Sequence, residues 1–231
     1  MTNRRRSRPT TAPKRSVKPA SQAFDPRWIV GGVAFVVIGA AVAAVLLTRP
    51  GDTGAGSAAT IRPDATAAAT TTVGSGASLP VFAATTGDPA IGRPIPEVHG
   101  ASFDGSSVAI HADGRPKLLL FLAHWCPHCQ REVPVVQAWL DAGRLPGAVD
   151  LISVATASDP ARPNYPPADW LRREHWQPPV LVDGDNAAAD RFGLSAFPYW
   201  VAVRSDGTVA SRVTGELTPA QLDALAASVA R

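Results

Sequence analysis

The strongest feature of the hydropathy pattern is an uninterrupted apolar run over residues 28–48, from Trp28 to Thr48, with no charged residue in it. A helix rises about 1.5 Å per residue, so this run matches the roughly 30 Å hydrocarbon layer of a bilayer. We therefore predict a transmembrane helix. A secretory signal peptide is the alternative, but the run exceeds the usual apolar region of about 7–15 residues. The Ala-rich stretch that follows leaves cleavage of the anchor open.

Beyond residue 91 the pattern changes to short apolar runs that alternate with amphipathic segments. Residues 117–123 and 149–155 are continuously apolar or nearly so, which is typical of strands buried on both faces. The expected strands are 107–110, 117–123, 149–155, 180–182, 199–204 and 208–213. The expected helices are 126–140, 168–175, 187–192 and a last helix that Thr218 caps, with Pro219 at its first position. Strands joined through helices predict an α/β fold with a central mixed sheet flanked by helices.

Four segments follow from these patterns. Residues 1–27 are rich in Arg, Pro, Ser and Thr and are expected to be disordered, and 28–48 form the anchor. Residues 49–90 are dominated by Ala, Thr, Gly, Ser and Pro, which bury too little apolar surface to offset the entropy of ordering. We interpret 49–90 as a flexible linker and 91–231 as the folded domain.

Composition and charge narrow the function classes. The net charge is +3, but the first 27 residues carry +7 and the remainder carries −4. The excess of basic residues therefore lies in the N-terminal tail, and the domain lacks the positive charge of a nucleic-acid-binding module. Basic residues before the apolar run place the N-terminus in the cytoplasm and the domain outside it. Two cysteines are too few for a disulfide-rich scaffold, and no metal site with four protein ligands is expected.

The sequence Cys126-Pro127-His128-Cys129 lies between a buried strand and the start of a helix. Cysteines three positions apart on one helical turn can close and reopen a small disulfide. The free N–H groups at a helix N-terminus favour a thiolate, and His128 adds a hydrogen-bond donor beside it. We predict a redox pair in which Cys126 is the exposed nucleophile and Cys129 is the buried resolving thiol.

Two other interpretations of the same cysteines remain open. A structural disulfide is the less favoured one, since closing so short a loop removes little chain entropy. A metal interpretation uses both thiols with His124 or His128 and corresponds to a copper or zinc chaperone.

The segment FLAHWCPHCQREVP resembles the active-site segment of thioredoxins, with Trp125 before the cysteines and Pro134 inside the helix. Phe197-Pro198 resembles the cis-proline that lies against the cysteines in that family and helps to bind substrate. The leading hairpin and the anchor are similar to extracytoplasmic proteins of the TlpA/ResA type. Two departures are visible. Leu120 stands where thioredoxins carry a buried Asp, and the Pro-His dipeptide resembles that of the oxidase DsbA.

This resemblance implies a thioredoxin-like fold and a membrane-anchored thiol–disulfide oxidoreductase that acts on exported proteins. It implies no small-molecule cofactor, because electrons pass to or from a membrane redox partner. Trp125 and Phe197 are expected at a rim that contacts substrate, whereas Glu132 is assigned only a solvated charge. The direction of electron flow stays open, because the architecture favours a reductase and the dipeptide favours an oxidase or isomerase.

Overall fold

The computed structural model describes residues 71–230. The expected basic tail, the apolar run and most of the expected linker lie outside these residues. Within residues 71–230, no helix has the length and apolar character that crossing a bilayer requires. The transmembrane helix over 28–48 therefore stays a prediction.

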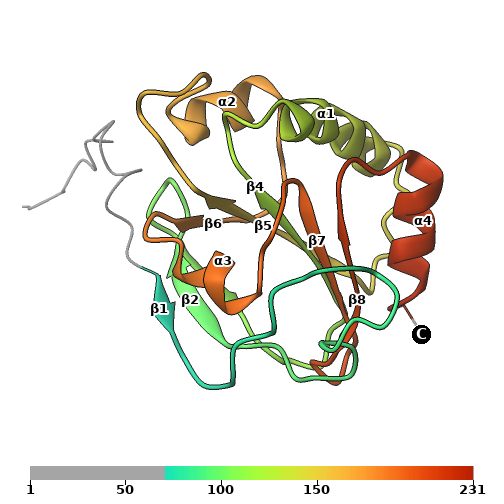
Figure 1. The fold of residues 1–231 in the computed structure, drawn as a ribbon. Helices are drawn as coiled ribbons and strands as arrows, with labels where there is room; N and C mark the ends of the chain where they lie inside the picture. The colour runs from blue at the N-terminus through green and yellow to red at the C-terminus, as the bar shows by residue number, and fades with distance from the viewer. Residues whose placement is uncertain (1–70, 231) are drawn as a thin grey trace, which may run out of the picture. The chain divides into compact units, whose positions relative to one another are not determined.

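The centre of the fold is a five-stranded sheet in the order β6-β5-β4-β7-β8 (Figure 1). Strands β4, β5 and β6 are parallel, while β7 runs antiparallel to both β4 and β8. The mixed sheet confirms the predicted fold class. The parallel pairs arise where a helix connects two strands, and the antiparallel β7–β8 pair arises from a hairpin. The strand bounds are β4 Lys117–Leu122, β5 Asp150–Thr156, β6 Val180–Asp183, β7 Tyr199–Val203 and β8 Val209–Thr214.

Helices cover both faces of this sheet. The helix bounds are α1 Pro127–Asp141, α2 Pro167–Arg173, α3 Ala187–Arg191 and α4 Pro219–Ala227, each close to its predicted range. Helices α1 and α4 lie together on one face, and α3 lies on the other with the small strands β1 and β2 (Figure 1). Thr218 caps α4 by a reciprocal capping box with Gln221, so the predicted helix start is confirmed.

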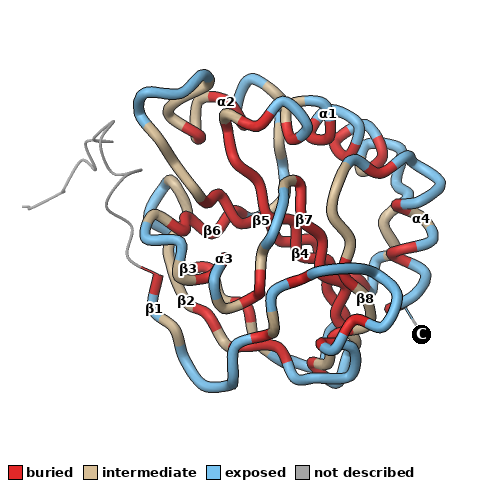
Figure 2. Tube along the Cα trace, viewed as in Figure 1, coloured by how far each residue is buried: buried red, intermediate tan, exposed pale blue. Residues whose placement is uncertain are grey.

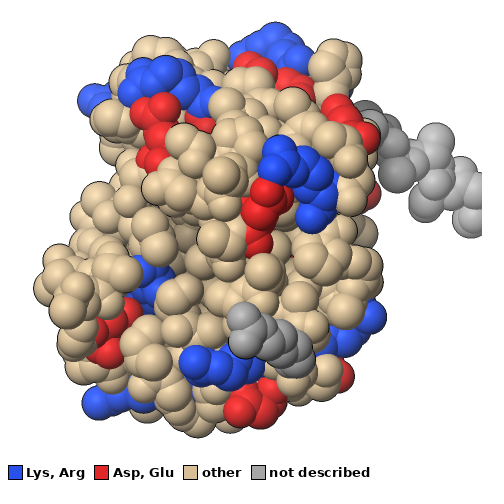
Figure 3. Space-filling model, turned by 90° about the vertical axis from the view of Figure 1, so that its right-hand side faces the viewer, with Lys and Arg blue, Asp and Glu red and all other residues tan. Residues whose placement is uncertain are grey.

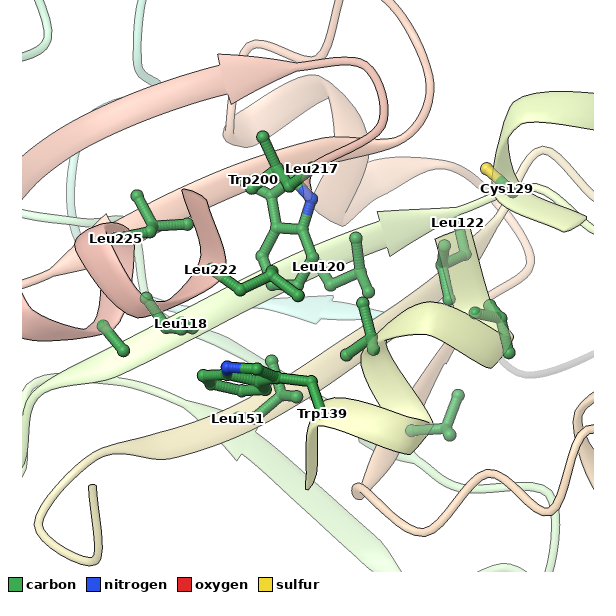
Figure 4. Close-up of a cluster of buried hydrophobic side chains, with 14 of the residues drawn as sticks. Leu118, Leu120, Leu122, Cys129, Trp139, Leu151, Trp200, Leu217, Leu222 and Leu225 are labelled. Carbon is green, nitrogen blue, oxygen red and sulfur yellow. The ribbon is translucent and has the colours of Figure 1, made fainter. Parts of the chain in front are cut away.

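The two faces of the sheet carry separate apolar clusters, because successive side chains of a strand point to opposite sides. In β4, Leu118, Leu120 and Leu122 join the cluster under α1 and α4, while Leu119 and Phe121 join the other cluster. The central strands are buried along their length, and the outer loops are exposed (Figure 2). The first cluster contains the tryptophans of α1 and β7, and Cys129 lies at its end, next to Leu122 (Figure 4).

A second, antiparallel sheet has the order β1-β2-β3, with bounds β1 Thr72–Val73, β2 Val98–Ala101 and β3 Ser107–Ile110. Only β3 was predicted. The β2 sequence VHGA has no apolar alternation and contains Gly100, so its strand character depends on pairing with β3 and on packing against Leu181. Its identification needed tertiary structure.

The N-terminal edge of the folded unit differs from the sequence prediction. Residues 71–90, assigned to the flexible linker, pack on the domain, and Leu79, Phe82 and Ala90 are buried in the second cluster. The Phe82 N–H donates to the Gly193 carbonyl at 2.9 Å. A few apolar residues that have a preformed surface to cover are enough to order this stretch, which composition alone does not reveal.

Candidate active site

Cys126 and Cys129 lie at the N-terminal end of α1, directly after β4. Cys126 is the N-cap residue and Pro127 opens the helix, where the missing N–H of proline costs no hydrogen bond. Both thiols are free, with 6% of Cys126 and 0% of Cys129 exposed. Burial raises the pKa of the Cys129 thiol well above its ordinary value. Cys129 is therefore the more buried of the two cysteines, as expected, although Cys126 is less exposed than the sequence suggests.

An aromatic rim flanks Cys126. The Trp125 and Phe197 rings meet edge to face, with centroids 6.0 Å apart. Trp125 Nε1 donates to the Ala157 carbonyl at 2.8 Å, which fixes the ring against the segment that follows β5. The Phe197–Pro198 peptide bond is cis, as the family resemblance implies. The fold thus brings together the two regions that the sequence singled out, although about 70 positions separate them.

His124 anchors the loop of residues 157–166 beside the cysteines. Its side chain is buried, with Nδ1 2.7 Å from the Pro163 carbonyl and Nε2 3.1 Å from the Asp159 N–H. A neutral ring that donates through Nδ1 and accepts through Nε2 satisfies both contacts. Burial lowers the pKa of His124, although the hydrogen bond to Pro163 opposes this effect. The loop also places the Arg162 guanidinium 4.5 Å from the Trp125 ring centroid.

Glu132 is the main functional candidate that the sequence analysis missed. It is buried rather than solvated, and both carboxylate oxygens accept hydrogen bonds, from Trp200 Nε1 at 3.0 Å and from the Leu217 N–H at 2.9 Å. Burial raises the pKa of Glu132 to about 7, against the effect of these two donors. The sequence contained a signal for the burial of Glu132, because Cys129, Glu132 and Val136 are spaced so that they lie on one face of a helix.

A charged cluster lies on the exposed side of the cysteine pair. His128 Nδ1 lies 2.7 Å from Glu216 Oε1, and Arg131 Nη2 lies 2.6 Å from the same oxygen. Arg131 Nε also donates to both oxygens of Glu216, at 3.0 and 3.1 Å. His128 and Arg131 come from α1, whereas Glu216 comes from the loop between β8 and α4.

The metal interpretation receives no support from the histidines. Both nitrogens of His124 are engaged by loop backbone, and Nδ1 of His128 is engaged by Glu216. Over residues 71–230 no cluster of three or more His, Cys, Asp or Glu side chains has the arrangement of a metal site.

Comparison with known proteins identifies the family and several relatives of this chain. The family described as Redoxin matches residues 86–227. The soluble secreted antigen MPT53 of Mycobacterium tuberculosis is 29% identical over 109 residues, which cover 47% of this chain and 57% of MPT53. Sporulation thiol-disulfide oxidoreductase A of Bacillus subtilis is 22% identical over 121 residues, which cover 52% of this chain and 72% of that protein. The match therefore spans little more than half the length of MPT53.

The fold has relatives among solved structures. A DsbF homologue from Corynebacterium diphtheriae has a TM-score of 0.51 and 18% identity, over 64% of this chain and 98% of that chain. A thiol:disulfide interchange protein of the thioredoxin family from Chlorobium tepidum has a TM-score of 0.51 and 19% identity, over 60% of this chain and 96% of that chain. These likenesses support the thioredoxin-like α/β fold. Since the family match extends over more than half of the sequence, the chain belongs to the Redoxin family of the thioredoxin superfamily.

Proposed function

We propose that this protein catalyses thiol–disulfide exchange through Cys126 and Cys129. The observation that carries the proposal is the unequal placement of the two thiols at one helix N-terminus. Cys126 retains some exposure beside the aromatic rim, and Cys129 is fully buried behind it. A reactive first thiol and a shielded second thiol are what a two-step exchange requires.

The reducing direction proceeds in two balanced steps. The Cys126 thiolate attacks one sulfur of a substrate disulfide, forming a mixed disulfide and releasing the other substrate sulfur as a thiolate. Cys129 then loses its proton and attacks Sγ of Cys126, which forms the Cys126–Cys129 disulfide and releases the second substrate thiol. Two electrons pass from the protein to the substrate. The oxidising direction is the same sequence in reverse.

Glu132 is the proposed proton acceptor of the second step. It lies three positions after Cys129 on the buried face of α1, and its negative charge contributes to raising the pKa of the Cys129 thiol. A carboxyl group with a pKa of about 7 can accept and return a proton near neutral pH. This supplies the acceptor that Leu120 cannot provide at the position of the thioredoxin Asp.

The proposed setting is outside the cytoplasm, on a chain anchored by residues 28–48. The charge asymmetry around that run supports this orientation, and the name of MPT53 describes a secreted protein. The proposed substrates are thiols and disulfides of exported proteins, and a membrane redox partner restores the active form. The aromatic rim of Trp125 and Phe197 offers an apolar surface for an unfolded polypeptide beside its disulfide.

The test compares Cys126→Ser with Cys129→Ser in the full chain. With insulin as substrate and dithiothreitol as reductant, Cys126→Ser should lose turnover. Reduced Cys129→Ser, mixed with insulin after removal of dithiothreitol, should accumulate a mixed disulfide between Cys126 and substrate, visible on a non-reducing gel. Turnover by Cys126→Ser at the wild-type rate would contradict the proposal.

The direction of electron flow can be determined by measuring the reduction potential of the Cys126–Cys129 couple against glutathione. A value near about −270 mV corresponds to a thioredoxin-like reductase, and a value near about −120 mV corresponds to a DsbA-like oxidant.

A further inference from the structure

The charged cluster of His128, Arg131 and Glu216 has no part in the exchange steps above. Two of its members, His128 and Arg131, lie on the first turns of α1, next to the nucleophilic end of the helix. The hydrogen bonds to Glu216 are the main cause that raises the pKa of Arg131, and a Cys126 thiolate adds to this effect, so the Arg131 and Cys126 charges lie within electrostatic range of each other. Any group that neutralises Arg131 therefore also changes the field at Cys126.

We propose that Glu216 is a positioning residue that holds His128 and neutralises Arg131, and thereby limits how strongly Arg131 stabilises the Cys126 thiolate. This inference rests on the proposed exchange function and extends it to a residue about 90 positions after Cys126 in the sequence. Glu216 touches neither cysteine in the structure. It acts through its two partners on α1.

The backbone on either side of Glu216 is fixed to the active site. The Gly215 N–H donates to the Pro198 carbonyl at 2.9 Å, and the Leu217 N–H donates to Glu132 at 2.9 Å. The loop is therefore clamped between the cis-proline segment and the buried carboxyl group of α1. Gly215 has φ +93°, a conformation that favours glycine at this turn. The position of Glu216 is thus set by the same contacts that build the site.

The contacts of His128 define its proton arrangement. A carboxylate oxygen only accepts, so the 2.7 Å contact with Glu216 requires a proton on Nδ1 of His128. Arg131 also lies 2.9 Å from this nitrogen, but an arginine can only donate, so that contact becomes a hydrogen bond only if Nδ1 loses its proton. Hydrogen bonds from Arg131 and His128 hold the pKa of Glu216 below its ordinary value, so Glu216 is an anion at neutral pH. Its charge selects the arrangement in which Nδ1 carries the proton.

The surface that carries α1 and α4 bears charged side chains of both signs (Figure 3). Basic side chains there lie beside acidic ones rather than in a patch of one charge. The Arg131–Glu216 pair is linked to the Cys-Pro-His-Cys segment by the contact between Glu216 and His128. Removing the acidic partner therefore leaves the Arg131 charge uncompensated on the turn of α1 that follows the cysteines.

The test measures thiolate formation at Cys126 in the reduced full-length chain, from the pH dependence of its alkylation by iodoacetamide. In Glu216→Gln the midpoint should move to lower pH, by roughly half a pH unit or more, because Arg131 is no longer neutralised. In Arg131→Gln it should move to higher pH, because Glu216 is left unpaired. Both shifts should shrink in about 1 M salt, which screens exposed charges.

A structural disturbance would not produce opposite shifts in the two variants. Asp169→Asn is the matched control, since it breaks an exposed Arg–Asp pair on α2 and should leave the midpoint unchanged. The inference is overturned if both variants keep the wild-type midpoint, or if both shift in the same direction.

The experiment distinguishes failure of the Glu216 inference from failure of the proposed exchange function. If wild-type protein fails to reduce insulin while the two midpoints shift in opposite directions, the exchange proposal fails and the electrostatic role of Glu216 stands. If turnover is intact and the midpoints do not move, only the role of Glu216 is overturned.

Discussion

At the scale of single residues, Glu132 shows how burial changes the chemistry of a side chain. In solution a glutamate is ionised at neutral pH, but the apolar face of α1 raises the pKa of Glu132 to about 7. The two donors that hold it, Trp200 Nε1 and the Leu217 N–H, keep both oxygens in place in either protonation state. The group is therefore suited to exchange a proton with its surroundings rather than to hold a permanent charge.

Glu132→Gln is expected to slow resolution of the mixed disulfide by roughly 10²-fold near pH 7, the usual size of a lost general base. Single-turnover release of substrate from the Cys126 adduct measures this step. The pH dependence centred near 7 should also disappear. The amide –NH₂ of Gln would face one of the two N–H donors, so a thermal unfolding curve is needed beside the kinetics. A wild-type release rate in a folded variant would argue against this role.

At the scale of elements, the loop of residues 157–166 depends on one buried imidazole. His124 accepts the Asp159 N–H through Nε2, and this contact requires an unprotonated nitrogen. The titratable or charged groups near the ring are Asp159, Arg162 and Tyr165, all of which belong to the loop itself. Protonation of His124 therefore weakens the attachment of the loop to the active-site strand.

Because burial lowers the pKa of His124 in the folded protein, the unfolded chain takes up this proton first as the pH falls. The stability that His124 contributes is present above about pH 6.5, its ordinary value, and is lost as the pH falls below that. We expect faster proteolytic cleavage within residues 157–166 at pH 5 than at pH 7.5. His124→Gln should remove this pH dependence, and His175→Asn is the matched control that should keep it. An unchanged dependence in His124→Gln would contradict the assignment.

At the scale of the whole domain, the segment from residue 71 to residue 90 is part of the fold. Its buried Asp88 pairs with Arg212 of β8, with Arg212 Nε donating to Asp88 Oδ2 at 2.8 Å. Both side chains are almost completely buried, so loss of one partner leaves an uncompensated charge in the interior. The hydrogen bond from Arg212 lowers the pKa of Asp88 and keeps it ionised.

Asp88→Ala should therefore destabilise the domain by about 3–5 kcal/mol, the usual cost of breaking a buried pair. Urea unfolding of the full chain measures this change. Asp169→Ala removes an exposed partner of Arg172 and should leave the midpoint unchanged. A fragment that begins at residue 91 should be destabilised like Asp88→Ala or more, since it also loses Leu79 and Phe82. Equal stability of fragments that begin at 71 and 91 would refute this role.

Local patterns were enough to predict most of the elements. The buried strands β4 and β5 and the helix start at Thr218 follow from continuous apolar runs and capping residues, which act over a few positions. The prediction of a redox pair follows from the spacing of Cys126 and Cys129 between a strand and a helix. Strand β2 and the packed segment 71–90 were not predicted, because their order depends on partners more distant in the chain.

Short-range periodicity and motif spacing were enough to predict the α/β class, the element order from residue 107 onward and the position of the two cysteines before α1. The surroundings of the thiols depend on the tertiary structure. It buries Glu132 against Trp200, attaches the 157–166 loop to His124 and brings Glu216 to His128. Such contacts join residues tens of positions apart, and their effect on charge depends on burial, which no local pattern specifies.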